Sequence, residues 1–163
     1  MSLKSLIFAL LLPMLLLLST AAQAQQDPVR PQYQSWGVRG GFANDPDQLV
    51  IGVHFDLGQI LDNLQFRPNI ELGIGDDHTV LAVTAPVHYR FKAHSEVRPY
   101  AGGGPAIGLV DRDRPGAGTD LEIALKAVAG AEWRLRNGND FFVELNLVFG
   151  DLHDAQILAG WTF

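Results

Sequence analysis

In the stretch DFFVELNLVFG, residues 140–150, large apolar side chains occupy every second position. One set of positions carries large apolar side chains: Phe141, Val143, Leu145, Leu147 and Phe149. The positions between them are mixed and include a charge: Phe142, Glu144, Asn146, Val148 and Gly150. Successive side chains of a β-strand point to opposite faces, so this period of two predicts a strand whose two faces lie in different surroundings.

Strand-like segments continue on both sides of this stretch, and turn residues separate them. The eight segments that we predict as strands are 35–42, 48–57, 64–75, 78–91, 97–110, 120–135, 140–150 and 153–163. The connections are short, and Asn137-Gly138 is a specific signal for a tight hairpin turn. An even number of strands with short connections can close on itself and leave no open edge. The sequence therefore predicts an all-β fold, an eight-stranded antiparallel up-and-down β-barrel.

The size of such a barrel indicates which face lies inside. Eight strands enclose a space just wide enough for side chains to fill, which is too narrow for all of the large apolar residues. The alternative is a soluble barrel with its apolar face inward, and it needs more interior than eight strands provide. The apolar faces must then point outward, where only lipid can cover them, so we predict a transmembrane β-barrel.

The opposite faces of the same segments carry charges of both signs. The positions expected inside are six basic and six acidic residues: Arg39, Arg67, Arg90, Arg98, Lys126 and Arg134, with Asp56, Glu71, Glu122, Glu132, Glu144 and Asp154. A buried charge persists only when it is paired and hydrogen-bonded. The equal numbers therefore predict an interior ion-pair network. The alternative is that charges at strand ends, such as Arg90, Arg134 and Asp154, lie in water.

The first 24 residues have the features of an export signal and not of a folded element. Lys4 is followed by an apolar run over residues 6–18, and Ala22-Gln23-Ala24 forms a small-residue cleavage site. We predict a signal peptide at 1–24, a periplasmic lead-in at 25–34 and the barrel at 35–163. The alternative is a membrane anchor, but the apolar run is shorter than the roughly 20 residues that a spanning helix needs.

Aromatic and proline positions give two further expectations. Outward aromatic residues open odd strands and close even ones, as Trp36 and Phe55 do, and so gather at the end that carries both termini. Such a girdle marks a membrane interface, and we expect this end to face the periplasm. Pro86 and Pro105 lie inside predicted strands and remove ladder donors, so we expect a bulge near Pro86.

Two stretches resemble a known family. The last strand, Ile157-Leu158-Ala159-Gly160-Trp161-Thr162-Phe163, resembles the C-terminal signature of outer-membrane barrels, and Arg98-Pro99-Tyr100-Ala101-Gly102-Gly103-Gly104 is similar to a strand of the outer membrane protein beta-barrel domain group. That group includes the small OmpX-like and OmpA-like barrels. The resemblance implies Sec-type export to a Gram-negative outer membrane and contact with its lipid and lipopolysaccharide. It also implies that the barrel-assembly machinery reads Trp161 and Phe163 as an assembly signal.

The sequence offers little catalytic chemistry. After the predicted signal peptide the chain has two serines, Ser35 and Ser95, and both map to the end expected in the periplasm. A lipid A-modifying enzyme of the serine type would need them at the other end. His54 and His88 are expected inside as hydrogen-bonded residues, although a metal or proton relay is an alternative. A cation site at the outer rim, built from Asp76, Asp77 and Asp151, is a further hypothesis because hard cations prefer carboxylate oxygens.

Composition narrows the function classes. A net charge of −6 argues against a nucleic-acid partner, and the absence of cysteine excludes disulfides and thiolate metal sites. We expect no cofactor, no enzyme activity and a monomer. The preferred interpretation is a barrel with a filled interior and a structural or interaction role. The alternatives are a narrow porin-like channel for small solutes and, third, a lipid A-modifying enzyme.

Overall fold

The computed structural model describes residues 32–44, 47–76, 78–93, 96–112, 118–150, 152 and 155–163. Eleven strands are present: β1 (Ser35–Asn44), β2 (Gln48–Asp56), β3 (Gln59–Leu61), β4 (Leu64–Phe66), β5 (Asn69–Ile74), β6 (His78–Thr84), β7 (Val87–Arg90), β8 (Val97–Arg112), β9 (Thr119–Arg134), β10 (Asp140–Phe149) and β11 (Ala155–Thr162). No helix within the described ranges is long and apolar enough to cross a membrane. The predicted signal peptide and most of the predicted lead-in, residues 1–31, lie outside these ranges.

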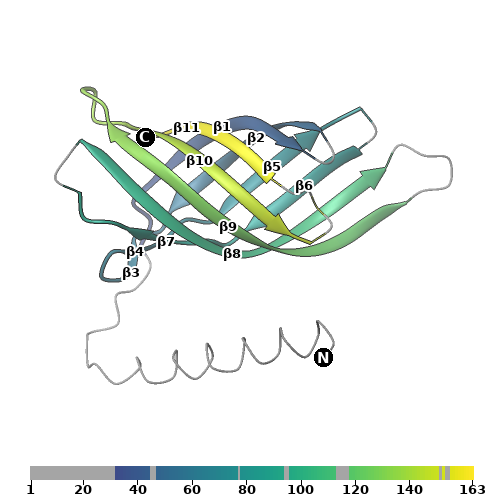
Figure 1. Ribbon diagram of the computed structural model, residues 1–163, viewed down its shortest axis with the longest axis horizontal. Coiled ribbons are helices and arrows are strands. Elements are labelled where there is room, and N and C mark those ends of the chain that lie inside the picture. Colours follow the sequence, from purple (N-terminus) through teal and green to yellow (C-terminus); the bar gives the residue numbers. More distant parts are fainter. Residues whose placement is uncertain are drawn as a thin grey trace, which may run out of the picture.

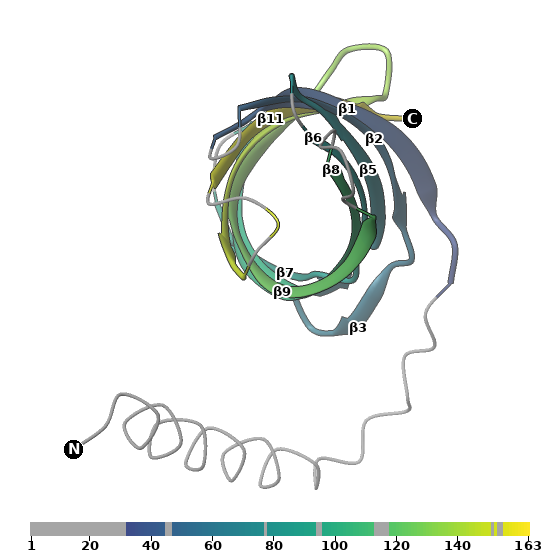
Figure 2. The ribbon, with the colours of Figure 1, turned by 90° about the vertical axis from the view of Figure 1, so that its right-hand side faces the viewer.

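The strands form one closed antiparallel sheet (Figures 1 and 2). Three pairs, β2 with β3, β4 with β5, and β6 with β7, are interrupted parts of single strands, so the wall consists of eight strands. β8 pairs with β9, and β1 pairs with β11 from Gly37 opposite Thr162 to Asn44 opposite Ala155, which closes the ring. The predicted eight-stranded up-and-down barrel is confirmed. Each strand neighbours the next in sequence because every connection is short.

The predicted bulge at Pro86 is wrong. Thr84 faces Ala106 and Val87 faces Gly103, so both strands advance equally across the interruption and no residue is inserted. The reason is that proline loses its N–H but keeps its carbonyl: Pro86 O accepts a hydrogen bond from Arg67 N at 3.1 Å. The register shift lies instead between Gln59 and Leu61 in the short hairpin of β3 and β4. β3 falls in the predicted connection 58–63, whereas β4 opens the predicted strand 64–75.

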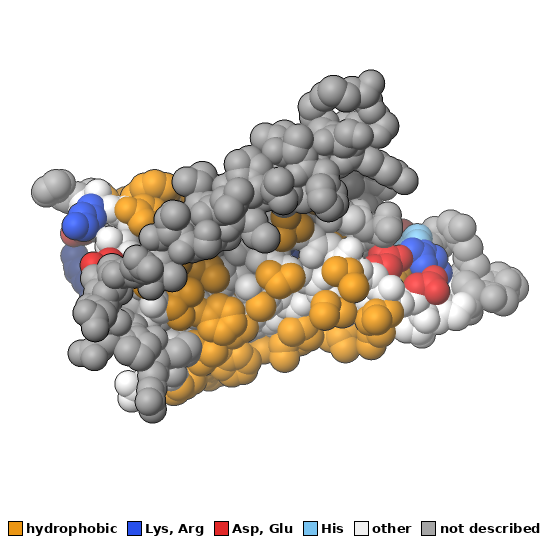
Figure 3. All heavy atoms as spheres, turned by 90° about the horizontal axis from the view of Figure 1, so that it is seen from below, with side chains coloured by type: hydrophobic (Ala, Val, Ile, Leu, Met, Phe, Trp, Pro, Cys, Tyr) orange, Lys and Arg blue, Asp and Glu red, His pale blue; other side chains and the backbone are white. Residues whose placement is uncertain are grey.

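The two faces of the wall differ as the parity predicted. Leu145 and Leu147 are about half exposed, at 48% and 46%, whereas Glu144, which precedes Leu145, is 1% exposed and Lys126 is 2% exposed. Figure 3 shows apolar side chains as a band along the barrel, with charged side chains gathered near its two ends. The apolar faces therefore point outward, and the soluble-barrel alternative is excluded.

The two ends of the barrel are distinct. We call the end with Ser35 and Phe163 the proximal end and the opposite end the distal end. The proximal end carries contacting outward aromatic rings, with Phe141 centred 5.2 Å from Trp161 and 5.8 Å from Trp133. The last residues of the predicted lead-in also attach here, since Gln34 N donates to Asp56 O at 2.8 Å.

The distal half of the lumen is apolar, although the sequence predicted an ion-pair network in the interior. Its buried inward side chains form the apolar plug: Val80, Ala82, Ala106, Val110, Ala124, Val148 and Leu152. Leu152 comes from the connection between β10 and β11 and is 2% exposed. A side chain at Gly108 would place its Cβ 2.2 Å from a Leu152 methyl, so this glycine provides the recess in which Leu152 sits.

Candidate functional site

The middle of the lumen holds a cluster of two cations and two carboxylates from different strands. Arg39 Nη1 of β1 lies 3.0 Å from Glu71 Oε1 of β5 and 3.1 Å from Glu144 Oε2 of β10. Lys126 Nζ of β9 lies 2.7 Å from Glu71 Oε2. The hydroxyl of Tyr100, on β8, donates to Glu144 Oε1 at 2.8 Å. We call these five residues the central cluster, and their charges balance across the width of the barrel.

Glycines on the inner face make room for these long side chains. A Cβ at Gly130 would lie 2.6 Å from the Tyr100 hydroxyl oxygen, and a Cβ at Gly52 would lie 3.0 Å from Cγ of Glu71. Because the interior of an eight-stranded barrel is narrow, each large inward residue needs such a small neighbour. The inward glycines are therefore part of how the cluster fits.

A second group lies between the central cluster and the proximal mouth, and we call it the proximal cluster. Its members are Asp56, Arg67, Arg90, Arg98, Glu132, Arg134 and Asp140. Glu132 is buried and lies within ion-pair distance of three guanidinium groups, from Arg67 at 2.8 Å, Arg90 at 3.1 Å and Arg98 at 2.9 Å. Charge-assisted pairs of this kind are stronger than neutral hydrogen bonds.

Asp140 forms the outer part of this cluster. It lies 2.6 Å from Arg98 Nη2 and 3.2 Å from Arg134 Nη1. The buried carboxylate of Asp56 accepts hydrogen bonds from Gly58 N and Gln65 Nε2 and lies 3.7 Å from Arg67. The cluster thus becomes steadily wetter toward the mouth, since Arg67 is 1% exposed and Arg134 is 61% exposed at the side chain.

The predicted network members fall into three groups. The structure brings Arg39, Glu71, Lys126 and Glu144 together in the central cluster, and Asp56, Arg67, Arg90, Arg98 and Glu132 in the proximal cluster. Arg134 belongs to the exposed edge of the proximal cluster, and Glu122 belongs to neither cluster. Glu122 pairs with Arg112 on the distal side of the apolar plug, and Arg134 reaches outward from the end of β9. Asp154 lies outside the described residues.

The partners of the predicted charged residues include some that were absent from the predicted set, such as Asp140, Tyr100 and Arg112. Asp140 opens β10 directly opposite Arg134, so a cross-strand pairing of these two segments would have revealed it. Tyr100 falls at an inward position of its strand. The alternation of inward and outward residues along that strand would have placed it in the lumen. Tyr100 also stacks on His88 with ring centroids 5.0 Å apart, and both residues are buried.

The two interior histidines occupy different surroundings. His54 Nε2 lies 2.9 Å from Thr162 Oγ1, whereas neither ring nitrogen of His88 has a hydrogen-bond partner among the residues that the structure describes. Within the described residues, no three histidine or acidic side chains are arranged to hold a metal ion. Of the predicted rim cation site, Asp76 is described and exposed, while Asp77 and Asp151 lie outside the described residues.

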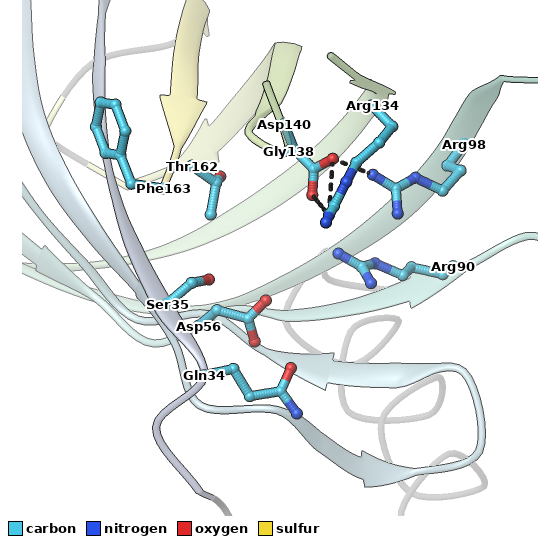
Figure 4. A pocket seen from close by; sticks show the side chains of 10 residues that line it. All are labelled: Gln34, Ser35, Asp56, Arg90, Arg98, Arg134, Gly138, Asp140, Thr162 and Phe163. Carbon is cyan, nitrogen blue, oxygen red and sulfur yellow. Dashed lines mark hydrogen bonds and ion pairs between the residues drawn. The ribbon is translucent and has the colours of Figure 1, made fainter. Parts of the chain in front are cut away.

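A cavity opens at the proximal mouth, with a volume of about 320 Å³ (Figure 4). Its lining includes Ser35 and the side chains of Arg90, Arg98 and Arg134. The guanidinium groups approach from one side, and Asp56 faces them from another. The second serine, Ser95, lies outside the described residues.

The predicted assembly signal forms the end of the closing strand. Trp161 and Phe163 are about half exposed on the outer surface, at 46% and 51%. Phe163 N donates to Trp36 O at 2.8 Å, and the Trp36 and Phe163 rings are centred 5.2 Å apart. The last residues of the chain are thus hydrogen-bonded to the first strand.

Comparisons with known proteins give a likeness in structure only. No protein-family model matches the sequence, and no curated protein matches it. Among solved structures, Neisserial surface protein A (NspA) matches with a TM-score of 0.62 at 14% identity, over 80% of this chain and 94% of that one. The N-terminal β-barrel domain of Pseudomonas aeruginosa OprF matches with the same TM-score and identity, over 81% of this chain and all of that one. A de novo designed transmembrane β-barrel matches with a TM-score of 0.50 at 16% identity, over 86% of this chain and 98% of that one. At these identities the likeness shows the fold.

Proposed function

We propose that this chain, which has the fold of the small eight-stranded outer-membrane barrels, is an integral outer-membrane protein with a filled, non-conducting lumen. Its role in this proposal is structural or interactive, and it carries out no catalysis. The comparisons support a membrane barrel of this type. The proposal of a non-conducting lumen rests on the side chains that fill the interior.

The observation that carries the proposal is that the lumen is obstructed at two successive levels by different means. At the middle, Glu71 is held by both Arg39 and Lys126, and all three side chains are 2% exposed. Toward the distal end, Leu152 and the other members of the apolar plug exclude the hydration that an ion would need. An ion would have to separate buried pairs and then cross an apolar segment.

The orientation and partners follow as parts of the same proposal. The proximal aromatic rings lie at the periplasmic interface, so the termini face the periplasm and the distal connections face outward. Residues 1–24 direct export, the assembly machinery recognises Trp161 and Phe163, and lipid and lipopolysaccharide surround a monomer. Ser35 at the proximal mouth then lies away from the outer leaflet, which argues against a lipid A-modifying enzyme.

A narrow porin-like channel is the second candidate, and one observation favours it. Several buried polar atoms in the lumen have no partner in the described part of the chain, among them Arg67 Nη1 and both nitrogens of His88. Buried groups of this kind are usually satisfied by water, so part of the lumen is expected to be hydrated. Arg67 and His88 lie proximal to the apolar plug, which separates their surroundings from the distal mouth, and we therefore place this candidate second.

Conductance in planar bilayers separates the two candidates. The folded protein, identified by heat-modifiable gel migration after extraction from the outer membrane, is expected to leave the bilayer current at its baseline. The positive control opens both levels. It combines Leu152→Ser and Val148→Ser, which make the distal segment polar, with Arg39→Ala and Glu144→Ala, which remove an oppositely charged pair from the central cluster. Discrete channel openings from the unmodified protein would overturn the non-conducting proposal.

A further inference from the structure

The proximal cavity has a surplus of basic groups. The proximal cluster contains four arginines, Arg67, Arg90, Arg98 and Arg134, and three carboxylates, from Asp56, Glu132 and Asp140. The central cluster is balanced by comparison. The extra positive charge therefore belongs to the mouth of the barrel, where three of the four guanidinium groups line the cavity.

These three arginines also have donors to spare. Arg90 and Arg98 use only Nη2 in their contacts with Glu132 and Asp140, and Arg134 uses only Nη1. No hydrogen bond or ion pair with a described residue uses the other terminal nitrogen of these arginines, and Arg98 Nε is buried without a partner among the described residues. A guanidinium group presents several N–H donors in a fixed plane, and two parallel donors match the two oxygens of a carboxylate or phosphate.

The carboxylates at the mouth do not occupy these donors. Asp140 lies between Arg98 and Arg134 and is 12% exposed at the side chain, and Glu132 is held below it at 1%. Asp56, on another wall of the cavity, is already engaged by Gly58 N and Gln65 Nε2. Figure 4 shows the three guanidinium groups converging on the cavity, while the lining opposite them includes Ser35 and Thr162.

We propose that the proximal cavity binds a small oxyanion, a carboxylate or phosphate group, through Arg90, Arg98 and Arg134. A volume of about 320 Å³ accommodates such a group or the end of a longer anionic molecule. The partly exposed arginines supply the charge, and the buried Glu132 fixes two of them in position. The site goes beyond the proposed structural role and does not depend on whether the barrel conducts.

The test is a titration of the full, folded barrel in detergent micelles with inorganic phosphate and, separately, with acetate. Ionic strength is held constant with chloride, and amide chemical shifts are followed by NMR. Saturable shifts are expected at the mouth, for example at Gly138 and Ser35, with none at Val110 in the apolar plug. Tighter binding of phosphate than of acetate would assign a phosphoryl ligand, and the reverse a carboxylate ligand; both support the site.

Arg98→Gln is expected to weaken binding about tenfold, the equivalent of one charge-assisted hydrogen bond. Arg112→Gln, the same change at the distal rim, serves as the matched control and is expected to leave affinity unchanged. Arg134→Gln alters a mostly exposed side chain, so it tests the site even if Arg98→Gln does not fold. Shifts that do not saturate, or that are equal in Arg98→Gln, Arg134→Gln and the control, would overturn the proposal.

Discussion

The two halves of the lumen are filled by opposite chemistry inside one wall. The central cluster uses full charges, and each charge requires a partner on another strand, as Glu71 requires both Arg39 and Lys126. The apolar plug uses side chains such as Val110 and Leu152 that need only to fit. The difference predicts how each half responds to substitution. Truncating a side chain leaves an unpaired charge in the central cluster and a void in the apolar plug.

The largest effect is expected from Glu71→Ala, which leaves Arg39 and Lys126 facing each other without a shared carboxylate. The free energy of unfolding should fall by about 3–5 kcal/mol, the range for breaking a buried ion pair on one side. Urea unfolding in lipid vesicles, followed by tryptophan fluorescence and gel migration, measures it. Asp62→Ala, in the exposed turn before β4, is the control. Equal losses in the two variants would contradict the buried role of Glu71.

Leu152→Ala tests the other half and is expected to cost less. Truncating a buried leucine removes transfer free energy and leaves a cavity, for which about 2 kcal/mol is the lower end of the usual range. The same unfolding assay applies, with Leu61→Ala in the exposed β3 as the matched control. If the loss in unfolding free energy is no greater than that of Leu61→Ala, the buried packing role of Leu152 is contradicted.

Tyr100→Phe probes the central cluster without unbalancing its charge. It removes the hydroxyl that donates to Glu144 and keeps the ring stacked on His88. The expected loss in unfolding free energy is about 1.5 kcal/mol, as for a hydrogen bond to a charged group. Tyr89→Phe, on the outer surface, should be close to neutral, so similar losses in the two variants would refute this role of the Tyr100 hydroxyl.

The smallest effect is expected outside both halves, at the distal rim. Asp120→Asn breaks a pair with Arg112 in which the aspartate side chain is 62% exposed. Such pairs contribute about 0.2–1 kcal/mol and are screened by salt. The difference in unfolding free energy between Asp120→Asn and the unmodified protein should become smaller as the sodium chloride concentration is raised. A loss as large as that of Glu71→Ala would remove the distinction between buried and exposed pairs.

Strand parity alone predicted most of the wall. It placed Leu145 outward and Glu144 inward because alternation is a local property of the chain. It could not predict which charges meet, since that depends on the stagger between strands, nor that Glu122 lies beyond the plug. The apolar plug was missed for a related reason: Leu152 falls in a connection, and its burial depends on the recess at Gly108 across the barrel.

The seam between β1 and β11 has a consequence for how the molecule forms. It pairs Gly37 of β1 with Thr162 of β11, so the ring closes only when these two strands, far apart in the sequence, have paired. Contacts of such high sequence separation slow folding, and until they form, β1 and β11 each present an unpaired edge to other chains. The barrel therefore completes in a single late step, and a nascent chain needs protection from sideways association until that step is over.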